Sequence, residues 1–146
     1  MAGSTAAALK AALKTAMAAE GALSAVAVSY GEPGELHRSE HIWIGSAVSG
    51  SVEPAVFRAG RVRRDEEYSL DVVIDVGSEP RPEDAETRAV LLGAVVEEML
   101  ADDPQVSNVT NLLWVIVDGF ELDTVESSEG PRSTYTLTLQ ARGRLL

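Results

Sequence analysis

The hydrophobic pattern of this chain predicts one long strand near its middle. Apolar side chains occupy every second position from Tyr68 to Val76, and polar residues, Asp71 and Asp75 among them, lie between. A period of two is typical of a strand with one buried face and one wet face. The pattern allows the strand to extend backward through Val62, which makes it the longest strand expected in the chain.

Two segments carry apolar residues at helical spacing. The first, Thr5 to Ala19, follows a candidate N-cap at Ser4 and places two leucines and a methionine on one face. The second begins at Pro82, a residue type favoured at the first helical position, and ends at Asp103-Pro104. Its apolar stripe is broad, so we expect one face of this helix to pack on a sheet.

Shorter strands joined by turns account for the rest of the pattern. Strand-like segments are Leu23 to Tyr30, His41 to Gly45, Leu112 to Val117, Phe120 to Val125 and Tyr135 to Ala141. We expect turns or loops at Gly31 to Gly34, Ser46 to Ser51, Asp118-Gly119 and Glu126 to Pro131. Pro54 should confine the chain after it to a sheet edge or an irregular path. The apolar run Leu112 to Val117 fits a strand buried on both faces, or on one face with a subunit contact on the other.

These elements predict a single domain over residues 1–146 of the α+β class. Only the sequence around the second helix has βαβ character, so the sheet should be mostly antiparallel. We expect about four to six strands, with both helices packed on one face of the sheet.

Composition and charge narrow the function. The chain of 146 residues is 45% hydrophobic but only 5% aromatic, which predicts a thin core that a partner subunit completes. Its net charge of −11, carried almost entirely by residues 61–146, argues against specific nucleic-acid binding, which needs clustered basic residues. There is no cysteine, and no apolar run is long enough to span a membrane, so we expect an unexported protein without disulfides or thiolate metal sites.

The sharpest catalytic motif is the segment His37-Arg38-Ser39-Glu40-His41, which fits the HxxEH pattern of inverted zinc peptidases. That chemistry needs both histidines on one helical face, whereas this segment runs directly into the strand-like Ile42-Trp43-Ile44. Histidines four positions apart on a strand would be roughly 13 Å apart. A solvated polar loop is therefore favoured over a zinc site.

Asp71 and Asp75 are the other candidate catalytic pair. They share one face of the long strand, but four residues of strand separate them too widely for the carboxylate pair of a glycosidase. We expect both to lie on a solvated face. No nucleophile elbow, calcium loop or phosphate loop occurs either, and the sequence predicts no catalytic residue, no metal and no cofactor.

The most distinctive polar feature is a block of opposite charges at the entrance to the long strand. We call it the charge block, and it consists of Arg61, Arg63, Arg64, Asp65, Glu66 and Glu67. Adjacent groups of opposite sign suit complementary pairing across a repeated subunit interface. The alternative is a solvated strand end. The charge block and the Ser46 to Ser51 loop are the candidate interfaces.

Several short segments form a pattern that extends over nearly the whole chain: the helix with Leu9 and Leu13, the turn Tyr30-Gly31-Glu32-Pro33-Gly34, Ile42-Trp43-Ile44-Gly45, Arg63 to Leu70, Ala101-Asp102-Asp103-Pro104 and the closing strand. Together these segments resemble the tail terminator proteins of long-tailed bacteriophages. Other neck and tail-completion proteins are similar in size.

The resemblance implies a small α+β subunit that forms a hexameric ring on the phage tail tube. Such a ring ends tube polymerisation and joins the tail to the head connector, with DNA passing through it and with no enzymatic activity. Its partners would be further copies of itself, the tail tube protein and the connector protein. Its location would be the host cytoplasm during assembly and then the virion, where the tail meets the head.

Two other classes of function stay open at this point. One is a small metal-dependent hydrolase built on His37, Glu40 and His41. The other is an acidic adaptor that binds a cellular protein.

Overall fold

The computed structural model describes residues 3–34, 40–58, 61–77 and 79–145, with the backbone alone at 54–58 and 61–63. Within these residues there are two α-helices, one short 3-10 helix and six strands. The helical elements are α1 (Ala6–Ala19), η1 (Gly21–Leu23) and α2 (Pro82–Asp102). The strands are β1 (Ala27–Ser29), β2 (Glu40–Ile44), β3 (Ser49–Arg58), β4 (Arg61–Val76), β5 (Leu112–Ser127) and β6 (Gly130–Leu145). None of the helices found in these residues is long and apolar enough to cross a membrane.

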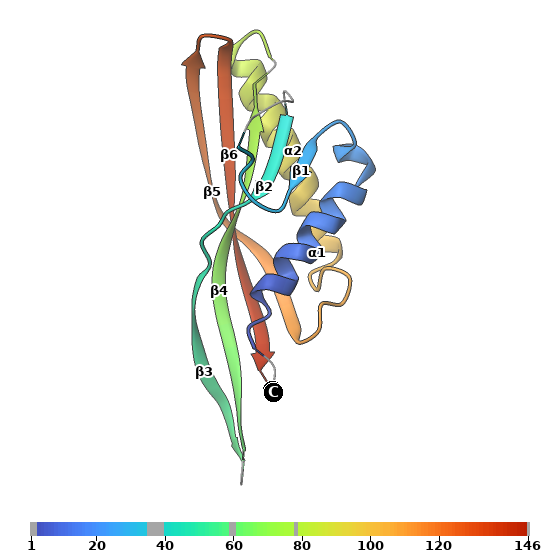
Figure 1. Cartoon of the computed structure of the whole chain (residues 1–146), viewed down its shortest axis with the longest axis vertical. Helices are drawn as coiled ribbons and strands as arrows, with labels where there is room; N and C mark the ends of the chain where they lie inside the picture. Colours follow the sequence, from blue (N-terminus) through green and yellow to red (C-terminus); the bar gives the residue numbers. More distant parts are fainter. Residues whose placement is uncertain (1–2, 35–39, 59–60, 78, 146) are drawn as a thin grey trace.

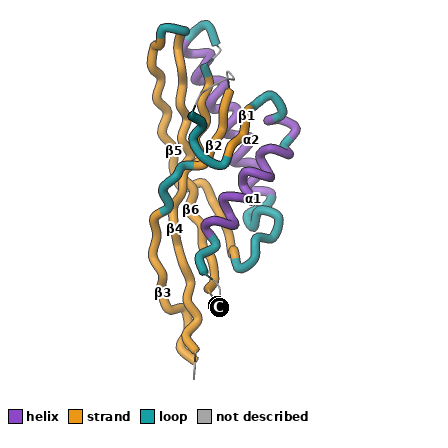
Figure 2. Tube along the Cα trace, viewed as in Figure 1, coloured by secondary structure: helices purple, strands orange, loops and turns teal. Residues whose placement is uncertain are grey.

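The strands form one sheet in the order β1-β2-β4-β6-β5, with β3 added beside β4. The β1 and β2 strands are parallel, and every other pair is antiparallel. Both helices lie on the same side of the sheet (Figures 1 and 2). The predicted α+β class, the mostly antiparallel sheet and the two helices on one face are confirmed.

The long strand predicted from the alternating pattern is β4, and it does extend backward past Val62 to Arg61. One edge of β4 pairs with β6 over residues 64–76. The other edge is shared by two strands, because β2 pairs with residues 72–76 and β3 with residues 61–69. β4 is therefore the central strand, which joins β2 and β3 on one edge to β6 on the other.

A single apolar layer lies between the helices and the sheet. On α1 the predicted leucine and methionine stripe, Leu9, Leu13 and Met17, is completely buried. The matching stripe of α2 includes Leu92, Val96 and Leu100. The alternate residues of the strands complete the layer, among them Ile42, Ile44, Leu70, Val72, Ile74, Leu137 and Leu139. The period of two in the strands and the helical period in α1 and α2 thus meet in one core.

At one end of the sheet, β3 and β4 project as a two-stranded arm. Within the described residues, 61–63 of β4 pair with β3 alone, because the register with β6 runs only to the pair Arg64 and Leu145. We define the arm as residues 54–58 and 61–63. It points away from both helices and lies at the bottom of Figure 1.

Two predictions for the first third of the chain were wrong, the loop at 46–51 and the strand at 23–30. The segment 46–51 is not all loop, because β3 begins at Ser49. Its Ser and Gly residues carry no strand pattern, but the exposed edge of β4 pairs with their backbone. The segment 23–30 starts at the last residue of η1 and has only three strand residues, Ala27–Ser29. Pro54 does lie on an edge strand, at a register shift between Pro54 and Val56, as expected.

The other errors concern β5 and β6. The two expected strands at 112–117 and 120–125 are one strand, and the bend expected at Asp118-Gly119 is a bulge between Val117 and Gly119. A bulge shifts the alternation by one residue, which makes a continuous strand look like two. The expected loop at 126–131 is mostly strand, because β5 and β6 continue to Ser127 and Gly130 and join in a tight turn.

Candidate interaction surface

The charge block lies on β4 and runs from the arm, which contains Arg61 and Arg63, into the body of the sheet. Strand alternation splits its acidic residues between two faces. Asp65 and Glu67 face Arg144 and Arg142 of β6 on the side without helices, whereas Glu66 lies on the helix side. The Arg64 side chain is exposed, and the side chains of Arg61 and Arg63 lie outside the described residues.

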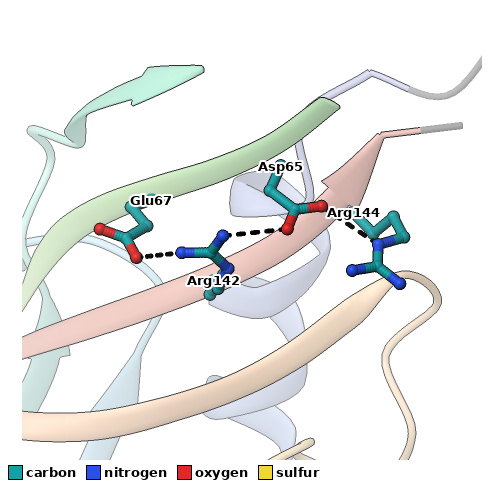
Figure 3. Close-up of polar contacts among 4 residues, drawn as sticks. All are labelled: Asp65, Glu67, Arg142 and Arg144. Carbon is teal, nitrogen blue, oxygen red and sulfur yellow. Dashed lines mark hydrogen bonds and ion pairs between the residues drawn. The ribbon is translucent and has the colours of Figure 1, made fainter. Parts of the chain in front are cut away.

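The acidic residues of the open face are held by two arginines of β6 (Figure 3). Arg142 donates from Nη2 to Asp65 Oδ2 at 3.0 Å and also bonds to Glu67, so it lies between the two carboxylates. Arg144 donates from Nε to Asp65 Oδ1 at 3.1 Å. The acidic side chains are therefore paired within the chain, by arginines other than the three of the charge block.

Asp65 is only 5% exposed, and its carboxylate depends on these arginines. The hydrogen bond from Arg144 is the main reason that the pKa of Asp65 is lowered, and the Arg142 hydrogen bond adds to it. Burial acts in the opposite direction and offsets part of the shift. The Asp65 carboxylate in turn raises the pKa of Arg142.

We expect Asp65→Asn to destabilise the protein at pH 7, by an amount that shrinks as the pH falls. A lowered pKa means that the ionised form favours the folded state, and this contribution is complete above the usual Asp pKa of about 3.9. It is lost as the pH falls through the lower pKa of the folded protein. Urea unfolding of both proteins between pH 7 and pH 2.5 measures the difference. The exposed Asp102→Asn is the matched control, and a difference that stays constant over this range would refute the expectation.

Glu66 has a structural role beneath the helices. Its Oε1 accepts from both the backbone N and the Oγ1 of Thr5, each at 2.7 Å, at the start of α1. Because the Thr5 hydroxyl proton is used in this way, the Tyr68 hydroxyl, 2.8 Å away, is the donor to Thr5 Oγ1. Burial raises the pKa of Tyr68 to about 12. A carboxylate at the positive end of α1 also complements the helix dipole.

This network also explains a glycine in β6. A Cβ atom on Gly143 would lie 2.8 Å from Thr5 Oγ1 and 2.9 Å from Glu66 Oε1. The position opposite Glu66 therefore has to remain without a side chain. Thr5, Glu66 and Gly143 together fix the start of α1 to the sheet.

Asp71 and Asp75 do share the face without helices, but the expectation that both are solvated was wrong for Asp75. Asp75 is 5% exposed, and its Oδ1 accepts from Arg132 Nη1 at 3.0 Å. Burial raises the pKa of Asp75, against the opposing effect of the Arg132 charge. Asp71 is half-buried and bonds instead to Thr138. Each aspartate is paired with a different residue of β6, and the two do not form a catalytic pair.

The HxxEH motif lies only partly in the described residues, because His37, Arg38 and Ser39 fall outside them. Glu40 and His41 lie on the strand β2 and not on a helix. Arg88 of α2 binds the Glu40 carboxylate through Nε at 2.5 Å and Nη2 at 3.0 Å. His41 is buried opposite Asp75. No group of three metal-ligating side chains occurs among the residues whose placement is known.

A second feature, which the sequence only hinted at, is the outer edge of β5. Over the described part of the chain, β5 pairs with β6 on one side and with no strand on the other. Exposed apolar side chains follow it: Ile116, Phe120, Leu122 and Val125. The buried Leu112 and Val115 and the exposed Ile116 fit the prediction of one buried face, and the subunit contact on the other face stays a prediction.

A groove of about 410 Å³ runs beside this edge. It lies between the C-terminal end of α2 and the first half of β5 and is mostly apolar. The residues that line it are Glu97, Leu100, Ala101, Pro104, Val115, Ile116 and Val117. The sequence does not predict this groove, because the groove depends on the distance between the end of α2 and the edge strand β5.

No protein-family model matches the sequence, and no curated protein matches it. Among solved structures, the fold is similar to that of a chain in the virion of a native gene transfer agent particle, with a TM-score of 0.61. The two chains are 18% identical, and the similarity covers 99% of this chain and 100% of the other. At this level of identity the likeness establishes a shared fold.

Proposed function

We propose that this chain is a structural protein of a phage-like virion, and specifically the subunit of a ring that caps the tail tube. The observation that carries the proposal is the match over essentially the full length of both chains to a component of a gene transfer agent virion. The resemblance of the sequence to tail terminator proteins leads to the same class of particle. Six copies would form the ring, end tube growth and join the tail to the head connector.

The structure supports an assembly role through its free surfaces. The described sheet leaves the outer edge of β5 unpaired and the arm projecting from the body. Unpaired strand edges readily associate with other chains, and natural proteins usually protect them. In a ring, these surfaces would be covered by neighbouring copies. The activity proposed is therefore assembly, without catalysis or a cofactor.

The net charge suits a ring through which DNA passes. Each copy carries a charge of −11, so a ring of six has a strongly negative field. If the acidic face lines the opening, DNA would pass without adhering to the wall. A ring with a basic lumen would contradict this part of the proposal.

Electron microscopy of the purified chain with tail tubes tests the proposed function. The tubes are assembled from the tail tube protein of the same genome. We expect a ring at one end of each tube and no further tube growth after the chain is added. Binding along the tube walls, or no binding, would refute tail termination. A ring that binds only the isolated head connector would indicate a neck protein instead.

A further inference from the structure

The groove beside β5 belongs to a strongly acidic part of the chain. Between Arg88 and Arg132 there is no Lys or Arg, and this segment includes most of α2 and all of β5. Glu97 lines the groove, and Asp118 is exposed directly after Val117, which also lines it. The floor is apolar, because Leu100 and Val115 are part of the core. An occupant of the groove should thus combine apolar and basic side chains.

The arm, with Arg64 at its root, has this composition. Residues 54–64 contain no acidic residue but carry four arginines, Arg58, Arg61, Arg63 and Arg64, together with Val56, Phe57 and Val62. A two-stranded hairpin is at best marginally stable alone in water, so the arm gains stability from a surface that covers it. Its charge and its apolar residues complement those of the groove.

The arm and the groove of the same chain cannot meet. The sheet register aligns Val115 in the groove with Ala141 and then with Tyr68 of β4. Arg61 lies seven residues farther along β4, a distance of roughly 23 Å at the usual rise of a strand. The arm continues away from the body in that direction (Figure 1). Its partner groove must therefore belong to another copy.

We infer that the arm of one copy docks into the groove between α2 and β5 of the next copy. The contact is head to tail, because the two surfaces differ, and repeated contacts of this kind close into a ring when the rotation between subunits allows it. The inference rests on the proposed ring and identifies the interface between its neighbouring subunits, which we call the seam. It also gives the exposed Arg64 of the charge block an acidic surface to face, since Asp65 and Glu67 of that block are already paired with Arg142 and Arg144.

Charge reversal on each side of the seam tests this inference. The arm variant carries Arg63→Glu and Arg64→Glu, and the groove variant carries Glu97→Lys and Asp118→Lys. Each variant alone places like charges at every seam, so we expect rings on tube ends to decrease about tenfold or more, which corresponds to about 1.4 kcal/mol. In an equal mixture, the acidic arm faces the basic groove and the basic arm faces the acidic groove. An alternating ring of six should then form at nearly the unmodified frequency.

Two control variants separate the seam from a general effect of charge. Lys14→Glu with Arg81→Glu changes the net charge as the arm variant does, and Glu126→Lys with Glu129→Lys matches the groove variant at the far end of β5. Both controls should form rings normally, and circular dichroism should show all four variants folded.

The possible outcomes distinguish the inference from the proposed function. If the unmodified chain forms rings but the two variants do so as well, or their mixture fails to recover, the arm-to-groove seam is wrong and the ring stands. If the unmodified chain forms no ring on tubes, the proposed function fails and the seam with it. The seam is supported only if each variant alone forms few rings and their mixture forms rings again.

Discussion

Gly93→Ala should destabilise the protein by about 1 to 3 kcal/mol, although alanine is the better helix former. Gly93 lies on the buried side of α2 and faces Tyr135 of β6. A Cβ atom at this position would lie 2.2 Å from Tyr135 Cε1 and 2.6 Å from Cδ1. Tyr135 is buried and also contacts the Phe120 ring, with centroids 5.8 Å apart, so its own ring has little room to move away from α2. Urea unfolding measures the change.

Whether Gly93→Ala stabilises or destabilises the protein should depend on the aromatic ring of Tyr135. In a Tyr135→Ala background both clashing ring atoms are removed, and Gly93→Ala should then stabilise the protein by up to about 1 kcal/mol through helix propensity. Ala94→Gly, at the exposed neighbouring position, is the matched control for propensity alone. If Gly93→Ala has the same effect with and without the Tyr135 ring, close packing is not the reason for the glycine.

Glu66→Ala should destabilise the protein by about 2 to 3 kcal/mol, because it removes a buried charged acceptor and leaves two donors of Thr5 without it. The two hydrogen bonds are each 2.7 Å long and join residues 61 positions apart. The loss of stability should affect α1 in particular as well as the whole protein. Hydrogen exchange should increase most in the first turns of α1, which Glu66 attaches to the sheet.

Glu67→Ala is the control for this change, since Glu67 is adjacent in sequence and its side chain is 42% exposed. Its ion pair with Arg142 lies at the surface, so we expect a loss of less than about 1 kcal/mol. Thr5→Ala combined with Glu66→Ala should cost less than the sum of the two single changes, because both variants remove the hydrogen bond between the Thr5 hydroxyl and Glu66. Additive losses, or equal losses at Glu66 and Glu67, would refute the role of Glu66.

The sequence predicted the elements whose hydrophobic pattern repeats regularly over many residues. The β4 strand alternates over most of its length, and α2 has both a Pro at its start and an Asp-Pro end, so each was located correctly. β3 was missed because its stability comes from pairing with β4 and not from its own Ser and Gly residues. The β5 strand was divided in two because one bulge reverses which residues face the core.

The candidate site was predicted in position but not in its contacts. Arg142 and Arg144 lie 77 and 79 residues from Asp65 along the chain, so only the antiparallel register reveals them as partners. The role of Glu66 could have been suspected, however. It lies two positions before Tyr68, on the same face as the buried residues of β4, where a solvated carboxylate is not expected.

The continuity of β4 has a mechanical consequence. Its register with β6 is unbroken from Val76 in the helix-covered core to Arg64 at the root of the arm, whereas the register shift beside the arm lies in β3. The arm therefore continues the path of the β4 strand out of the core. If neighbouring copies are held by their arms, the twist of a single strand sets the angle between them, and the curvature of the ring is encoded in the fold of each subunit.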